Sequence, residues 1–124
     1  MNESCILLVD DDENILELFR RVLQYEGYDV EIASTGKDAI NMTRNRNYDL
    51  AILDYMLKDI RGDKLAVELS KNDSNKILFV SGYAGAEDSL ASLPIDNKGV
   101  LMKPVGLERL TDAVKIALTS IKNI

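Results

Sequence analysis

Histidine is absent from this chain of 124 residues, and cysteine occurs once, at Cys5. The lack of histidine excludes Ser-His-Asp and Cys-His nucleophile systems, and one cysteine cannot form an ordinary zinc site. One cysteine also cannot form a disulfide within the chain, and this fits a reducing compartment. We therefore expect a cytoplasmic domain whose chemistry uses carboxylates, hydroxyls and amines.

Long apolar runs and excess positive charge are also missing. The longest charge-free run, Ile77 to Ala86, is half the length of a membrane span, and Met1 to Ser4 lacks the basic start of a signal peptide. The chain has 15 basic and 21 acidic residues, a net charge of −6. This balance argues against nucleic acid or an anionic membrane as a direct partner.

Short apolar runs alternate with helical patterns from end to end, and the length fits one domain over residues 1–124. The runs are Cys5–Val9, Val30–Ala33, Leu50–Leu53, Ile77–Val80 and Val100–Met102. Helices are expected around Ile15–Leu23 with a stop at Gly27, over Gly36–Arg46, Asp63–Lys71 and Ala86–Leu93, and along a stripe from Leu107 to Ile121. Most runs are continuously apolar, as in strands covered on both faces. The alternation predicts an α/β fold, a doubly wound five-stranded parallel sheet with helices on both faces.

Polar side chains follow several of these expected strands. They are Asp10, Asp11 and Asp12 after the first strand, Asp54 after the third, Ser81 after the fourth and Lys103 after the fifth. Because ligands of open α/β sheets bind at the carboxyl ends of the strands, we expect these groups to converge. Crowded carboxylates repel one another unless a cation intervenes, and an all-oxygen site suits Mg²⁺. A carboxylate beside Mg²⁺, a lysine and a hydroxyl is equipped to accept a phosphoryl group.

In this arrangement the chain resembles the receiver domains of response regulators in two-component signalling. The matching segments are Leu8-Val9-Asp10-Asp11, Leu53-Asp54 with Gly62 eight residues later, Phe79-Val80-Ser81-Gly82, and Lys103-Pro104. Each segment alone is weak, but all four in this order at strand ends are specific. The resemblance implies the flavodoxin-like strand order 2-1-3-4-5.

The resemblance also implies a role for each site residue. Asp54 would accept a phosphoryl group from a sensor histidine kinase or a phosphotransfer protein. Asp11, Asp54 and the backbone carbonyl of Met56 would bind Mg²⁺, with Asp10 in the same acidic pocket. Ser81 and Lys103 would contact the phosphoryl oxygens, and the bond before Pro104 can be cis. Downstream effectors would dock on the surface of the fourth helix, fifth strand and fifth helix.

Some positions depart from the usual pattern of the family. Lys58 stands where a proline is common, and Val100 stands where many relatives carry an aromatic residue that swings inward on activation. The resemblance also implies that Met56 and Tyr83 occupy the two positions best placed to control access of water to the phosphorylated site. Neither is a small polar group, so a long-lived phosphorylated state is expected.

Three other interpretations fit parts of the pattern. One is that Asp10 to Asp12 simply cap the first helix, since Asp10-x-x-Glu13 resembles a capping box. Asp10-Asp11-Asp12 contains the Asp-x-Asp signature of haloacid-dehalogenase-type phosphatases, in which Asp10 would be the nucleophile. That reading leaves Asp54 and Gly62 unexplained and lacks a later acidic pair for the metal. A receiver-like docking module that is never phosphorylated is the third, although its site residues would then have no use.

Overall fold

A computed structural model of the chain describes residues 4–72, 76–83 and 85–119, and ten elements alternate along it. The strands are β1 (Cys5–Val9), β2 (Asp29–Ala33), β3 (Leu50–Asp54), β4 (Lys76–Ser81) and β5 (Asp96–Met102). The helices are α1 (Glu13–Tyr25), α2 (Gly36–Asn45), α3 (Gly62–Asn72), α4 (Ala86–Leu90) and α5 (Leu107–Thr119). Ile121, the last residue of the expected helical stripe, lies outside the described residues.

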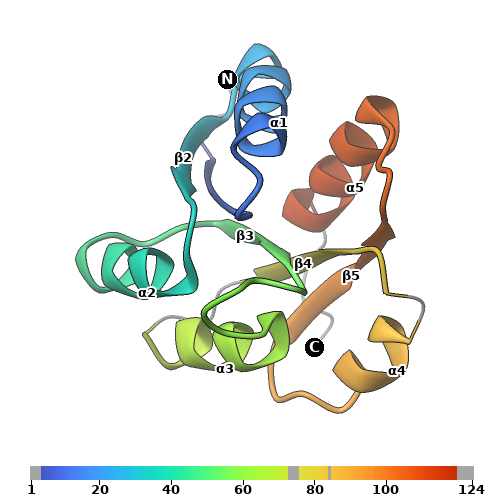
Figure 1. Cartoon of the computed structure of the whole chain (residues 1–124). Coiled ribbons are helices and arrows are strands. Elements are labelled where there is room, and N and C mark those ends of the chain that lie inside the picture. The colour runs from blue at the N-terminus through green and yellow to red at the C-terminus, as the bar shows by residue number, and fades with distance from the viewer. Residues whose placement is uncertain (1–3, 73–75, 84, 120–124) are drawn as a thin grey trace.

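The strands form one sheet in the order β2-β1-β3-β4-β5, and every neighbouring pair is parallel. This confirms the predicted α/β class and the flavodoxin-like strand order. Helices α1 and α5 lie on one face of the sheet, and α2, α3 and α4 lie on the other (Figure 1). Because the strands are parallel, all five end at the same edge of the sheet. This is the edge at which the sequence predicts the site residues. Within the described residues, none of the helices has both the length and the apolar run that a bilayer crossing requires.

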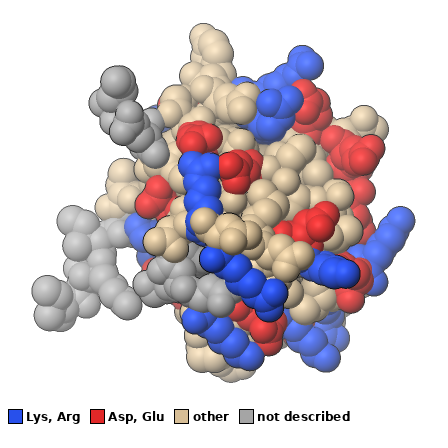
Figure 2. Space-filling view, turned by 90° about the vertical axis from the view of Figure 1, so that its left-hand side faces the viewer, with Lys and Arg blue, Asp and Glu red and all other residues tan. Residues whose placement is uncertain are grey.

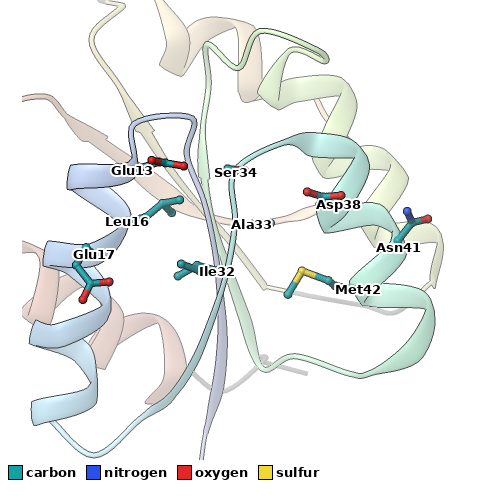
Figure 3. Close-up of a pocket in the computed structure, with 9 residues that line it drawn as sticks. All are labelled: Glu13, Leu16, Glu17, Ile32, Ala33, Ser34, Asp38, Asn41 and Met42. Atoms are coloured by element: carbon teal, nitrogen blue, oxygen red, sulfur yellow. The ribbon is translucent and has the colours of Figure 1, made fainter.

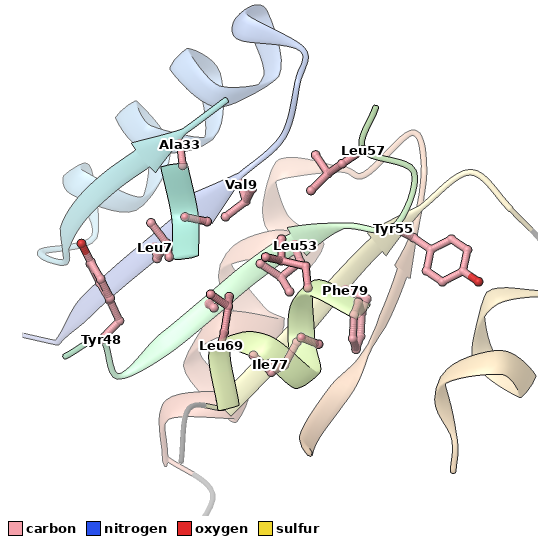
Figure 4. Packing of buried hydrophobic residues seen from close by; sticks show 14 of the residues in the cluster. Leu7, Val9, Ala33, Tyr48, Leu53, Tyr55, Leu57, Leu69, Ile77 and Phe79 are labelled. Carbon is pink, nitrogen blue, oxygen red and sulfur yellow. The ribbon is translucent and has the colours of Figure 1, made fainter. Parts of the chain in front are cut away.

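Each face of the sheet carries its own apolar core. Leu7, Leu53 and Phe79 face α2, α3 and α4 and are fully buried, and Figure 4 shows part of this cluster. Ile6 and Leu50 point to the opposite face, where they join the buried side chains of α1 and α5. Because both faces are covered, the strands read as unbroken apolar runs. The central strands are thereby fixed on both sides, and they hold the site residues at their ends in place.

The boundaries of α1 follow from local hydrogen bonds. The Asp12 carboxylate caps the helix by accepting the N–H groups of Asn14 and Ile15 at 3.0 and 3.3 Å. Helix capping from within Asp10–Asp12 is therefore confirmed, but the N-cap is Asp12, so the capping box that would begin at Asp10 is wrong in its register. At the other end Gly27 has φ +97° and donates to Gln24, a left-handed C-terminal stop that confirms the sequence prediction.

Most element boundaries lie within two residues of the sequence prediction, but two differ by three or more. Helix α4 ends at Leu90 rather than Leu93, and β5 begins at Asp96 rather than Val100. The early part of β5 was missed because it is polar and contains Gly99, which sits in a bulge opposite β4 with φ +125°. A bulge with a left-handed glycine interrupts the alternation on which strand prediction relies.

Edge strand β2 is held from outside by a charged cluster. The Arg46 guanidinium forms ion pairs with Asp29, at 2.6 Å, and with Glu31, and it lies over the ring of Tyr48. The hydroxyl of Tyr48 donates to Glu31. Figure 2 shows the face that includes α2 and β2, with basic and acidic side chains interspersed. Paired charges along an edge strand disfavour pairing with another chain.

Helix α2 begins against a carboxylate from a distant loop. The two oxygens of Asp59 accept the N–H groups of Gly36 and Lys37, each at 3.0 Å. Thr35 supplies a second cap by accepting the N–H of Asp38 at 3.1 Å. Partial burial raises the pKa of Asp59, but the N–H groups of Gly36 and Lys37 outweigh that effect and leave the pKa below its usual value. The loop after β3 is thereby fastened to α2.

We expect Asp59→Asn to lower the free energy of unfolding by about 1 kcal/mol at pH 7, because an amide accepts through one oxygen and carries no charge. A depressed carboxyl pKa stabilises the fold above the unfolded-state value of about 3.9, and this stabilisation is lost as pH falls through the folded-state value. The difference between wild type and variant should therefore shrink below about pH 4. Urea unfolding at pH 7 and at acid pH measures it, with the exposed Asp112→Asn as the matched control. An equal difference at both pH values would contradict the assignment.

Candidate functional site at the carboxyl edge of the sheet

Three carboxylates meet at the carboxyl edge of the sheet. Asp10 follows β1, Asp11 comes next, and Asp54 is the last residue of β3, which pairs with β1. One carboxylate oxygen of each lies within 4.8 Å of the others. Asp10 and Asp54 are each only 5% exposed, whereas Asp11 is half-buried. Three oxygen ligands at this spacing fit a small hard cation such as Mg²⁺, as the sequence predicted.

Lys103 joins two of these carboxylates. Its Nζ lies 3.3 Å from Oδ2 of Asp10 and 3.4 Å from Oδ2 of Asp54. The backbone N–H of Lys103 donates to the carbonyl of Ser81 at 2.8 Å, which fixes the start of the loop after β5. The following bond, to Pro104, is cis, as the family resemblance led us to expect.

The electrostatics of the cluster are unbalanced. Burial raises the pKa of Asp10 above its ordinary value, and the charge of Asp54 adds to the increase. The Asp12 N–H, which donates to Asp10 at 2.9 Å, and the Lys103 ammonium offset the increase only in part. Burial lowers the pKa of Lys103, but the two carboxylates outweigh it and raise that pKa overall. One ammonium among three carboxylates leaves a negative site that attracts a further cation.

Ser81 is the last residue of β4, and Met56 lies two residues after the end of the neighbouring strand β3. Ser81 is completely buried at the end of β4, and its Oγ accepts the N–H of Tyr83 at 2.9 Å. The N–H of Met56 donates to Oδ1 of Asp54 at 3.3 Å, while its side chain is 60% exposed. Both residues therefore lie at the edge of the sheet where the sequence predicted them.

The structure gives a steric reason for Gly62, the glycine that lies eight residues after Asp54. A Cβ at this position would lie 2.7 Å from Cα of Tyr55 and 2.9 Å from the carbonyl oxygen of Asp54. The N–H of Gly62 also donates to the Tyr55 carbonyl at 2.7 Å. The start of α3 can thus pack directly on the backbone beside Asp54, and a larger residue would displace it.

An aromatic contact that the sequence did not predict crosses the same edge. The rings of Tyr55 and Tyr83 are stacked with centroids 5.8 Å apart and planes 14° apart. Figure 4 shows the Tyr55 ring just beyond the end of β3, and Tyr55 belongs to the buried cluster drawn there. The sequence does place a tyrosine shortly after β3 and another shortly after β4. The spacing of residues along the chain does not show, however, that side chains of two different loops are in contact. The role expected for Met56 and Tyr83 in excluding water stays a prediction.

A second hollow lies between α1 and α2 over the edge strand β2 (Figure 3). Its lining combines apolar side chains such as Ile32 and Met42 with the acidic Glu13, Glu17 and Asp38. Glu17 already forms ion pairs with two arginines of its own helix. This hollow includes none of the site residues and offers no comparable cluster of chemical groups.

The comparisons with known proteins agree with this geometry. The family model described as the response regulator receiver domain matches residues 6–115. The chain belongs to this family. Receiver domains generally bind Mg²⁺ in an acidic pocket, and the cluster of Asp10, Asp11 and Asp54 is compatible with that property. Response regulators are signalling proteins that act with histidine kinases and downstream effectors.

Among curated proteins, the receiver domain is 28% identical over 113 residues to the response regulator ArlR of Staphylococcus saprophyticus, covering 91% of this chain and 51% of that protein. It is 31% identical over 110 residues to the nisin biosynthesis regulatory protein NisR of Lactococcus lactis, covering 89% of this chain and 48% of that protein. The chain thus spans about half the length of these curated relatives.

Two solved structures are similar over nearly their whole length. A CheY-like receiver domain protein from Methanospirillum hungatei is 36% identical with a TM-score of 0.86, and 94% of each chain is covered. The response regulator TrrA from Thermotoga maritima, solved in complex with Mg²⁺ and BeF, is 34% identical with a TM-score of 0.82. That match covers 93% of this chain and 99% of the TrrA chain.

The raised pKa of Asp10 means that folding disfavours its ionised form. We expect Asp10→Asn to raise the free energy of unfolding by about 1 kcal/mol at pH 7 in metal-free buffer. Because the folded state holds its proton more tightly, wild-type stability falls as pH rises above about 4, and the gain from the variant should vanish near and below that pH. Urea unfolding with a chelator measures the effect, again with Asp112→Asn as the control. Lower stability of the variant at pH 7 would show that Lys103 outweighs the repulsion.

Proposed function

We propose that this receiver domain accepts a phosphoryl group on Asp54 from the phosphohistidine of a sensor histidine kinase or phosphotransfer protein. The observation that carries the proposal is the contact of Lys103 with Asp54 at the buried end of β3, beside Asp10 and Asp11. A carboxylate held next to an ammonium and two further carboxylates is positioned for metal-assisted attack on phosphorus. The domain would act as a switch and catalyse only its own phosphorylation and dephosphorylation.

The residues proposed to hold Mg²⁺ are Asp11 and Asp54 directly, the backbone carbonyl of Met56, and Asp10 through water. The donor set fits the metal because it is made of oxygens and carries excess negative charge. When bound, Mg²⁺ neutralises charge on the transferring group and on the carboxylates, which lets an anionic donor approach. TrrA, which is 34% identical, was solved with Mg²⁺ and a BeF group, and this supports the assignment by similarity.

In the proposed transfer, an oxygen of Asp54 attacks phosphorus in line with the bond to the donor nitrogen. A P–O bond forms, the P–N bond breaks, and the donor imidazole leaves with the electron pair and takes up a proton. Lys103 then shifts from pairing with carboxylates to pairing with a phosphoryl oxygen, and the Ser81 hydroxyl donates to another. The added charge of nearly −2 draws both groups toward Asp54 and changes the loops after β4 and β5.

The wider role follows from the same chemistry. We propose that residues 1–124 form a single receiver domain and that it works in the cytoplasm, where the kinase would present its phosphohistidine. The surface proposed for effectors consists of α4, β5 and α5, which adjoin the loops of Ser81 and Lys103. Direct binding to nucleic acid or a membrane is not expected of this domain, because its net charge of −6 opposes both.

Asp54 is expected to be the residue that becomes phosphorylated, in a reaction that requires Mg²⁺. The protein is incubated with a small phosphodonor such as acetyl phosphate, with Mg²⁺ or with chelator, and the modified residue is mapped by mass spectrometry. Asp54→Asn should abolish labelling, because an amide oxygen is a poor nucleophile, while Asp112→Asn should label normally. Labelling at Asp10 in the Asp54→Asn protein would support the haloacid-dehalogenase-type alternative. No labelling of any residue would leave the docking-module alternative.

Asp11→Asn is expected to weaken Mg²⁺ binding by tenfold or more, because it removes a charged ligand from a three-carboxylate site (roughly 1.4 kcal/mol). The fold should be retained, since Asp11 is half-buried and is not the residue that caps α1. Isothermal titration with MgCl₂ measures the affinity, and Asp12→Asn is the neighbouring control. Equal Mg²⁺ affinity in the Asp11→Asn and wild-type proteins would remove Asp11 from the ligand set.

A further inference from the structure

Tyr83 connects Ser81 to several parts of the carboxyl edge. Its N–H donates to the buried Oγ of Ser81 at 2.9 Å, and its carbonyl accepts the N–H of Ala86, the first residue of α4, at 3.2 Å. Its ring stacks on Tyr55, the residue directly after Asp54. Among the described residues, the hydroxyl of Ser81 therefore bonds to the backbone of Tyr83 rather than to Asp54.

The partner ring belongs to a fixed part of the fold. The N–H of Tyr55 donates to the Val80 carbonyl at 2.9 Å, and its carbonyl accepts the N–H of Gly62 at 2.7 Å. Tyr55 is 4% exposed, whereas Tyr83 is 51% exposed. The Tyr55 backbone is thus bonded to β4 and to the start of α3, whereas within the described residues the backbone bonds of Tyr83 go only to residues two and three positions away, on the more exposed loop after β4. A stack between the two restrains the loop against the strand.

Gly85 leaves room for the Tyr83 ring on its other side. A Cβ at Gly85 would lie 2.6 Å from the Tyr83 hydroxyl oxygen and 2.7 Å from Cζ. The backbone of Gly85 has φ −89°, a value that alanine adopts readily. An alanine here is therefore compatible with the backbone but not with the observed position of the ring. By contrast, a Cβ at Gly82 would meet nothing within 4 Å.

We propose that Tyr83 is a positioning residue for the phosphoryl reaction: stacked on Tyr55, it holds the Ser81 hydroxyl away from Asp54 until the phosphoryl group arrives. This rests on the proposed function of Asp54 as the acceptor. In the proposed switch, Ser81 turns toward the phosphoryl oxygens, the Tyr83 backbone that is hydrogen-bonded to it follows, and the ring leaves Tyr55. Val100, which takes the place of the usual aromatic residue, cannot supply a ring for this switch. The Tyr55–Tyr83 pair does so instead.

The test uses Mg²⁺ with fluoroberyllate as a probe for the phosphoryl group and measures its dissociation constant by titration. A stacked pair has an energy that corresponds to a factor of about three to ten in an equilibrium constant. Tyr83→Ala should therefore bind fluoroberyllate about three- to tenfold more tightly than wild type. Gly85→Ala, which displaces the ring without removing it, should bind more tightly as well. Tyr83→Phe, which keeps the stack, should restore wild-type affinity.

Two controls separate this effect from general damage. Tyr25→Ala removes a tyrosine that is 90% exposed on α1 and should leave the affinity unchanged. Mg²⁺ affinity without fluoroberyllate should be equal in all variants, since none of them alters a carboxylate. Loss of folding would weaken fluoroberyllate binding, so the expected tightening cannot arise from a merely structural defect.

Nuclear magnetic resonance reports the stack directly. In the wild-type protein the ring protons of Tyr55 and Tyr83 should show mutual ring-current shifts that disappear in the fluoroberyllate complex. Unchanged ring signals at saturation would overturn the proposal, and so would weaker or equal binding by Tyr83→Ala and Gly85→Ala. A wild-type protein that fails to bind fluoroberyllate at any Mg²⁺ concentration would instead refute the proposed function of Asp54.

Discussion

The contact of Lys103 with Asp10 and Asp54 is the constraint on which the carboxyl edge depends. Buried carboxylates are tolerated only when they are paired or hydrogen-bonded, and here one ammonium pairs with two of them at 3.3 and 3.4 Å. The pair also links non-adjacent strands, because Asp10 follows β1 and Lys103 follows β5. The parallel sheet makes this possible by ending all its strands at one edge.

Much of this arrangement could be predicted from the sequence, for physical reasons. Continuous apolar runs identify strands that are buried on both faces, and parallel topology then brings the groups that follow them together. Asp10 and Asp54 were placed correctly because each lies at the end of a strand whose apolar pattern is unambiguous, and Lys103 because the short apolar run Val100–Met102 marks the end of β5. Element boundaries were harder to predict where polar residues dominate: β5 begins before Val100, and a glycine bulge hides its first residues.

Contacts between loops were the part that the sequence could not supply. Asp59 reaches the first N–H groups of α2 across 23 and 22 residues, and no local pattern signals such a cap. The stack of Tyr55 on Tyr83 is of the same kind, since each tyrosine alone reads as an apolar residue near a strand end. Such contacts depend on the distance between loops, which the fold determines only after the sheet has assembled.

The carboxyl edge of the sheet therefore combines a rigid core with a cluster of unbalanced charges. The core below it is rigid, because central strands buried on both faces leave the backbone of Asp54 and Tyr55 little freedom. The charges above it are unbalanced, because a single Lys103 cannot neutralise three carboxylates. A rigid base with an unsatisfied surface responds to a new ligand by moving its least restrained parts. These are the segments that follow Ser81 and Lys103, and α4, only five residues long, adjoins the first of them. A ligand that changes the charge at the acidic pocket is therefore expected to move these segments, which adjoin the surface proposed to bind partners.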